Sequence, residues 1–167
     1  AKSTFLRVNR ERAKRSFGNV GLYNWASSYS STMTDGTKLL NGVGINKKFA
    51  SNPALLQEGL NRCVKTGFHP VGCDTIKSII DHEMGHEIDK LLGRLSRQDK
   101  FKSIVKKYSI VDDLSRYPVT MKRANDIYAE TLAEGWTEYL NNLTPRPFAK
   151  EIGDLILDEY RSKFGGS

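Results

Sequence analysis

Apolar residues recur at three- and four-residue spacing through the second half of the chain, whereas polar residues fill the positions between them. The clearest set comprises Ile76, Ile79, Ile80, Met84, Ile88 and Leu91. This is the spacing of one apolar stripe along an α-helix. It predicts a helix from Thr75 to about Leu92, with Asp74 as its N-cap and Gly93 at the C-terminal glycine position.

The same reasoning predicts four further helices and one strand. The predicted helices cover residues 53–65, 96–108, 123–142 and 147–164, and Pro53 suits the first helical position. Residues 39–49 alternate apolar side chains at Val43, Ile45 and Phe49, which predicts a strand. Helix dominates and strand is sparse, so we expect an α+β fold, mostly helical with a small mixed sheet.

Length and composition are those of an ordinary globular domain. The chain has 167 residues, of which 38% are hydrophobic and 27% charged, so it can bury one core. Residues 18–167 are expected to form that domain, and residues 1–17 a basic arm or helix. No apolar run approaches the roughly 18 residues that a membrane-spanning helix needs, and no signal peptide is visible.

The net charge of +7 is concentrated in two segments. Residues 1–15 and 94–107 each carry a net charge of +5. Such segments are solvated helix faces, or they bind nucleic acid or an acidic protein surface. The two cysteines, Cys63 and Cys73, either pair or stay reduced, and they do not assign a compartment.

The segment His82-Glu83-Met84-Gly85-His86 carries the most specific chemistry. Histidines four residues apart share one face of a helix, so both imidazoles can reach one Zn²⁺. Glu83 projects from the neighbouring side, where it can act as general base toward metal-activated water. Gly85 is a poor helix former, and it predicts close packing beside the metal.

A catalytic zinc needs a third protein ligand. The extended HExxHxxGxxH form is absent, because position 92 is Leu. One source is His69, in the loop before the helix. The other is the predicted helix 123–142, where Glu130 and Glu134 lie four residues apart and therefore share a face.

HEMGHEID, a Ser-Arg-Tyr turn and YAETLAEGWTEYL together resemble the gluzincin metallopeptidases of the anthrax lethal factor and Pro-Pro endopeptidase type. They resemble still more the peptidase-like domains of phage head-morphogenesis (minor capsid) proteins and polymorphic toxins, which carry a similar loop before the HExxH helix. The resemblance spans residues 39–139. A weaker resemblance, to ImmA/IrrE-type zincins, rests on residues 124–129, and the acidic ligand of that family is missing here.

The gluzincin resemblance implies a zincin-like fold and a role for each matching residue. His82, His86 and Glu130 would bind Zn²⁺, and Glu83 would be the general base. Glu134 and Asp89 would be acceptors behind the ligands. The family tyrosine that stabilises the oxyanion would be Tyr117, and Tyr128 is its rival.

The sequence therefore predicts a zinc-dependent endopeptidase acting on a peptide or protein. The resemblance implies a setting in a phage virion or a delivered effector, with the basic segments as docking surfaces. The alternative is a catalytically silent zincin-like module that binds partners through those basic segments. Glu83 argues against this alternative, because a structural zinc does not need that carboxylate.

Overall fold

The structure is a computed structural model, and it describes residues 26–32, 38–45 and 52–165. The basic arm predicted for residues 1–17 lies outside this part. The strands are β1 (Ala26–Thr32) and β2 (Lys38–Ile45). The helices are α3 (Pro53–Lys65), α4 (Ile76–Leu91), α5 (Asp99–Val105), α6 (Ile110–Asp113), α7 (Ala124–Asn141) and α8 (Pro147–Phe164), with short 3₁₀ turns η1 (Leu95–Arg97) and η2 (Pro118–Thr120).

The predicted α+β fold with a small mixed sheet is wrong. From residue 52 to 165 the chain is all-α, and the strands described are one antiparallel pair. In this pair Ala26 lies opposite Ile45 and Thr32 opposite Lys38. Residues 39–45 of the predicted strand thus form one strand of a hairpin, and residues 46–49 lie outside the described part. The apolar pattern from residue 52 onward has the period of helices.

The predicted helix 96–108 is also wrong, because the structure divides it into η1 and α5. Ser96 donates from its backbone N–H to Asp89 Oδ1 at 2.7 Å and from its hydroxyl to Asp89 Oδ2 at 2.8 Å. These bonds hold the chain in a turn after α4. Gln98 then takes an extended conformation, which separates the two short helices.

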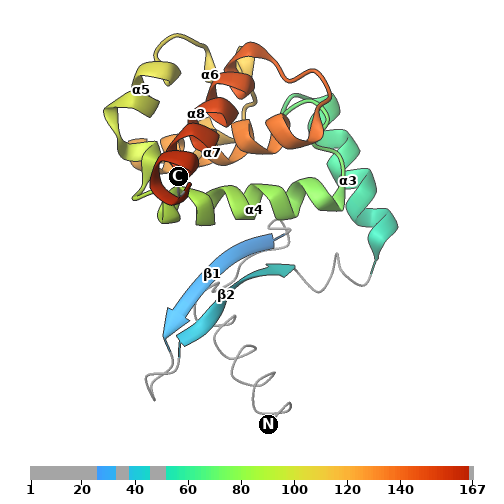
Figure 1. Cartoon of the computed structure of the whole chain (residues 1–167). Helices are drawn as coiled ribbons and strands as arrows, with labels where there is room; N and C mark the ends of the chain where they lie inside the picture. Colours follow the sequence, from blue (N-terminus) through green and yellow to red (C-terminus); the bar gives the residue numbers. More distant parts are fainter. Residues whose placement is uncertain (1–25, 33–37, 46–51, 166–167) are drawn as a thin grey trace.

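The helices pack in layers, with α7 between α4 and α8 (Figure 1). The main core fills the space around α7 and is built from α5, α7 and α8 together with the segments that join them. Its buried residues are Leu92, Leu95, Phe101, Val105, Leu114, Leu132, Trp136, Phe148, Ala149, Ile152 and Ile156. The hairpin β1-β2 lies on the other side of α4 and slants away from it, so α4 lies between the hairpin and α7 (Figure 1).

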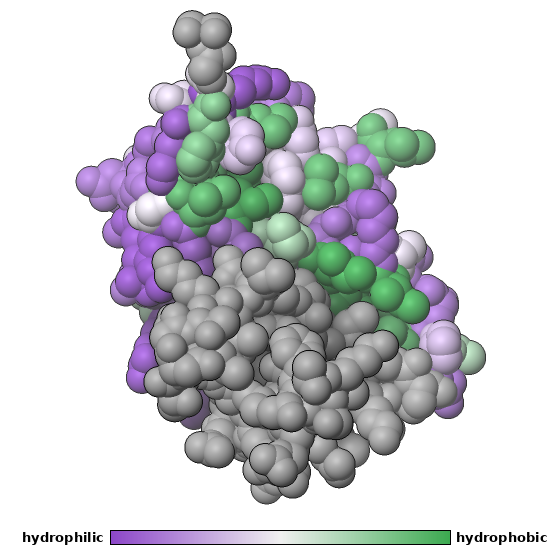
Figure 2. Space-filling view, turned by 60° about the horizontal axis from the view of Figure 1, so that its bottom comes forward, coloured by the Kyte–Doolittle hydropathy of each residue, from purple (hydrophilic) through white to green (hydrophobic). Residues whose placement is uncertain are grey.

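The apolar stripe that the spacing predicted on α4 is only partly buried. Ile79 is buried and packs with Leu56 and Leu60 of α3 in a second small core. Four others are 37–48% exposed: Ile76, Ile80, Met84 and Leu91. Hydrophobic residues are also visible at the surface on the face turned forward in Figure 2. The edges of the stripe, at Ile79 and Ile88, therefore pack against two different cores, and the residues between them are exposed.

Close contact between α4 and α7 depends on Gly85. A Cβ atom placed on Gly85 would lie 2.9 Å from the Cα of Ala133, closer than such atoms approach in real proteins. The close packing predicted at this glycine is confirmed. Since the ligand candidates lie on these two helices, Gly85 sets the distance between them.

We expect Gly85→Ala to destabilise the protein, although helix propensity alone would favour alanine by about 1 kcal/mol. Overpacking against a backbone atom costs about 1–3 kcal/mol, which outweighs that gain. The measurement is chemical denaturation of the metal-free protein. Ser103→Ala, at an exposed position of α5, is the control. A gain in stability for Gly85→Ala would contradict the packing assigned here.

The two cysteines do not pair. Cys63 and Cys73 are both free thiols, and burial raises the pKa of Cys73 well above its ordinary value. None of the helices within the described part of the chain combines the length and apolar character needed to cross a membrane.

Candidate metal centre

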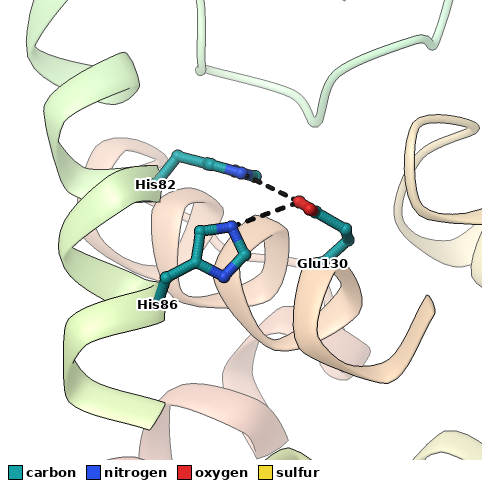
Figure 3. Close-up of side chains that lie close together, drawn as sticks. All are labelled: His82, His86 and Glu130. Carbon is teal, nitrogen blue, oxygen red and sulfur yellow. Dashed lines mark hydrogen bonds and ion pairs between the residues drawn. The ribbon is translucent and has the colours of Figure 1, made fainter. Parts of the chain in front are cut away.

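Three potential metal ligands converge where α4 passes α7 (Figure 3). His82 Nε2 lies 3.1 Å from Glu130 Oε2, and His86 Nε2 lies 3.3 Å from the same oxygen. One donor atom from each of the three residues lies within 4.8 Å of the other two. Two helices that are far apart in sequence thus bring two imidazoles and a carboxylate to one point.

The spacing of these donors suits a tetrahedral zinc ion. Bonds of about 2.0–2.2 Å in tetrahedral geometry hold neighbouring donors about 3.3–3.6 Å apart. The two imidazole–carboxylate distances, 3.1 and 3.3 Å, are close to this value. Two histidines and a glutamate are also a known ligand set of catalytic zinc, one that keeps a position open. The residues present therefore fit the metal.

A second carboxylate, Glu134, lies directly behind His82. Its Oε1 is 2.9 Å from His82 Nδ1 and 3.0 Å from His69 Nδ1, and its Oε2 accepts a hydrogen bond from Ser115 Oγ at 2.7 Å. The contact of buried His82 Nδ1 with Glu134 is an ion pair and does not have the geometry of a hydrogen bond. Glu134 itself is 1% exposed, and such a carboxylate needs donors from every side.

The charges of this cluster are strongly coupled. Burial alone would lower the pKa of His82, but contacts with Glu130 and Glu134 raise it to about 10. Burial alone would raise the pKa of both glutamates, but the histidines lower it to about 2 in each. The carboxylates therefore stay ionised and demand positive charge beside them. Without metal a proton on His82 supplies it, and a divalent cation can take that proton's place.

Tyr117 and Tyr128 are the two candidates for the tyrosine that stabilises the oxyanion, and Tyr117 is the one that lies at this site. Its ring centroid is 5.8 Å from that of His82 and 5.3 Å from that of His69. Burial raises the pKa of Tyr117, and the nearby carboxylates of Glu130, Glu134 and Glu83 raise it further. Its phenol thus keeps its proton at neutral pH and can donate a hydrogen bond.

Tyr128 occupies different surroundings. It packs against the main hydrophobic core, and Lys102 Nζ lies 5.9 Å from the centroid of its ring. The stretch between Tyr117 and Glu130 contains the 3₁₀ turn η2, which packs against α7.

Glu83 lies on α4 beside His82 and is 8% exposed. It is not among the three converging donors, which agrees with a proton-transfer role rather than a ligand role. Asp89 is placed elsewhere. The hydrogen bonds recorded for its carboxylate come from Ser96, and none comes from a histidine in the part of the chain that the structure describes.

The sequence identified the ligand candidates but not the residues that surround Glu134. The sequence offers both His69 and Glu130 as the third ligand. In the structure Glu130 joins the two histidines of α4, and His69 Nδ1 contacts Glu134 instead. Ser115 was noted only as part of the Ser-Arg-Tyr turn. No local pattern predicts these contacts, because they join residues 65 and 19 positions apart.

Comparison of the chain with protein-family models, curated proteins and solved structures gave no match.

Proposed function

We propose that this protein is a zinc-dependent endopeptidase. The observation that carries the proposal is the convergence of His82, His86 and Glu130 within 4.8 Å, with donor spacing that suits zinc. Two further residues support a hydrolytic role. Glu83 is a buried carboxylate that follows His82 in the chain, and Tyr117 keeps its phenolic proton at neutral pH. That the bond is a peptide bond follows from the gluzincin resemblance of the motif, as does a setting in a phage virion or a delivered effector.

The chain's own residues divide the reaction between them. Zinc, when bound, would polarise the substrate carbonyl and make water acidic enough to give up a proton near neutral pH. Glu83 accepts that proton as the water oxygen adds to the carbonyl carbon. It then returns the proton to the amine nitrogen as the C–N bond breaks. Tyr117 donates its phenolic hydrogen to the oxygen on which negative charge develops.

The test of this function needs no knowledge of the natural substrate. The full chain is freed of metal with a chelator, reloaded with one equivalent of zinc, and incubated with a peptide library derived from a digested proteome. Mass spectrometry should find new internal cleavages with the zinc-loaded protein and none with the metal-free protein. A protein that takes up no zinc, or that binds zinc and cleaves nothing, would contradict the proposal.

Zinc affinity should rise with pH. In the metal-free protein Glu130 and Glu134 raise the pKa of His82 to about 10, so His82 carries a proton throughout the neutral range. Zinc must displace that proton, and each proton displaced strengthens binding about tenfold for each pH unit. Competition with a chromophoric chelator between pH 6 and 8 measures this slope. Equal affinity across that range would contradict the displacement of a proton from His82 by zinc.

The alternative, a silent module that acts through its basic segments, finds less support in the described segment 94–107. Two of its lysines are engaged by α8, since Lys100 pairs with Glu159 at 2.6 Å and Lys107 with Glu151 at 2.7 Å. These pairs reduce the positive charge that the surface offers to nucleic acid or to an acidic partner. Zinc binding without any cleavage would favour this alternative.

A further inference from the structure

The side chains that contact Glu134 come from three separate parts of the chain. His82 belongs to α4, His69 to the loop between α3 and α4, and Ser115 to the segment before η2. The contact of His69 is a two-centre one, since its Nδ1 lies 3.0 Å from Oε1 and 3.3 Å from Oε2. His69 therefore faces both oxygens of the carboxylate.

The backbone holds the ring of His69 in this place. The N–H groups of Arg116 and Tyr117 donate to the carbonyl oxygens of Gly67 and Phe68, at 3.0 and 3.1 Å. The guanidinium of Arg116 also donates to the carbonyl oxygen of Thr66 at 2.9 Å. Residues 66–69 and 115–117 thus form one hydrogen-bonded unit. This unit presents both His69 and Ser115 to Glu134, and it also carries Tyr117.

We propose that His69 is a positioning residue of the zinc site, acting through Glu134. Together with Ser115 it fixes the carboxylate so that Oε1 faces His82 Nδ1. A carboxylate at Nδ1 holds the proton on that nitrogen and leaves Nε2 as the atom that binds metal. The inference rests on the proposed zinc site, and it assigns His69 a role outside the three ligands.

Loss of His69 would leave Glu134 short of a donor. The carboxylate is 1% exposed, so water cannot readily replace the lost hydrogen bond, and an unsatisfied buried charge is costly. We expect the carboxylate to rotate toward its remaining donors. His82 would then lose the partner that orients its ring, although all three ligands remain in place.

The test compares two substitutions of the same residue in the full chain. His69→Ala removes the donor, whereas the amide nitrogen of His69→Asn stands close to where Nδ1 was and can still donate to Glu134. Val71→Ala, at a 51% exposed position of the same loop, is the control. Zinc affinity is measured by competition with a chelator. The visible spectrum of the cobalt-substituted protein reports on ligand geometry, and thermal unfolding of the metal-free forms reports on folding.

We expect His69→Ala to bind zinc about tenfold more weakly than wild type, the lower end of the effect of partners behind ligand histidines, with an altered cobalt spectrum. His69→Asn should stay within about threefold of wild type, and Val71→Ala should be unchanged. Wild-type affinity in His69→Ala would overturn the proposal, as would an asparagine variant no better than alanine. If His69→Ala does not fold, His69→Leu, which also lacks the donor, takes its place in the comparison with His69→Asn.

The outcomes separate this inference from the proposed function. A wild-type protein that takes up no zinc contradicts the zinc site itself, and the role of His69 falls with it. A wild-type protein that binds zinc, alongside a His69→Ala variant that binds it equally well, contradicts only the role of His69.

Discussion

Replacing Glu83 with glutamine is expected to reduce peptide hydrolysis by about 10²–10⁴-fold, the usual contribution of a general acid–base residue, without loss of zinc. An amide is nearly the same size as a carboxylate but cannot accept the proton of the attacking water. Glu83 is 8% exposed and lies outside the group of converging donors. The variant should therefore fold and bind metal as the wild type does.

Glu87→Gln is the matched control for this variant, because Glu87 lies one turn further along α4 and pairs with Lys90. Zinc content by elemental analysis and kcat/KM on a peptide identified in the library would be measured for all three proteins. Full activity in Glu83→Gln would remove Glu83 from the mechanism. Loss of zinc from the variant would instead make Glu83 a ligand.

Replacing Glu130 with glutamine is expected to weaken zinc binding by more than about 100-fold. Substitutions of residues behind the ligands already cost about 10–100-fold in metal affinity, and a ligand should cost more. Glu130 Oε2 is the atom that both imidazoles approach, at 3.1 and 3.3 Å. Its loss removes the negative donor and leaves two neutral ones. Zinc should then no longer raise the melting temperature of the protein.

The control for this change lies on the same helix. Asp126 is an exposed acidic residue one turn before Glu130, so Asp126→Asn removes the same charge without touching the site. Chelator competition and thermal unfolding with and without zinc distinguish the two variants. A Glu130→Gln protein that still holds one zinc per chain at wild-type affinity would exclude Glu130 as a ligand.

Local signals in the sequence predicted the long helices well. The helix predicted at 53–65 is α3, where Pro53 stands in the first turn and Asn52 Oδ1 accepts from the backbone N–H of Leu55 at 3.1 Å. The helix predicted at 147–164 matches α8. The start of α4 differs by one residue, because Thr75 rather than Asp74 is the N-cap and bonds reciprocally with Ser78.

The predictions that were wrong depended on contacts between distant parts of the chain. A mixed sheet needs further strands, but the apolar residues of the described segment 52–165 have helical spacing and form helices. Residues 96–108 carry enough periodicity for one helix, but the donors of Ser96 are taken by Asp89 and the helix breaks there. The family resemblance, which made Asp89 an acceptor behind the zinc ligands, could not reveal this competition.

By itself, then, the sequence determined which side chains share a helical face. His82 and His86 on α4, and Glu130 and Glu134 on α7, follow from a four-residue spacing that any helix satisfies. Only the tertiary structure decided how these faces meet. Gly85 lets α4 approach Ala133 of α7 closely, and the loop that carries His69 delivers a donor 65 residues away from Glu134. The physical reason is that helical periodicity is a local property of the backbone, whereas a buried carboxylate takes its donors from whichever segments the packing brings near.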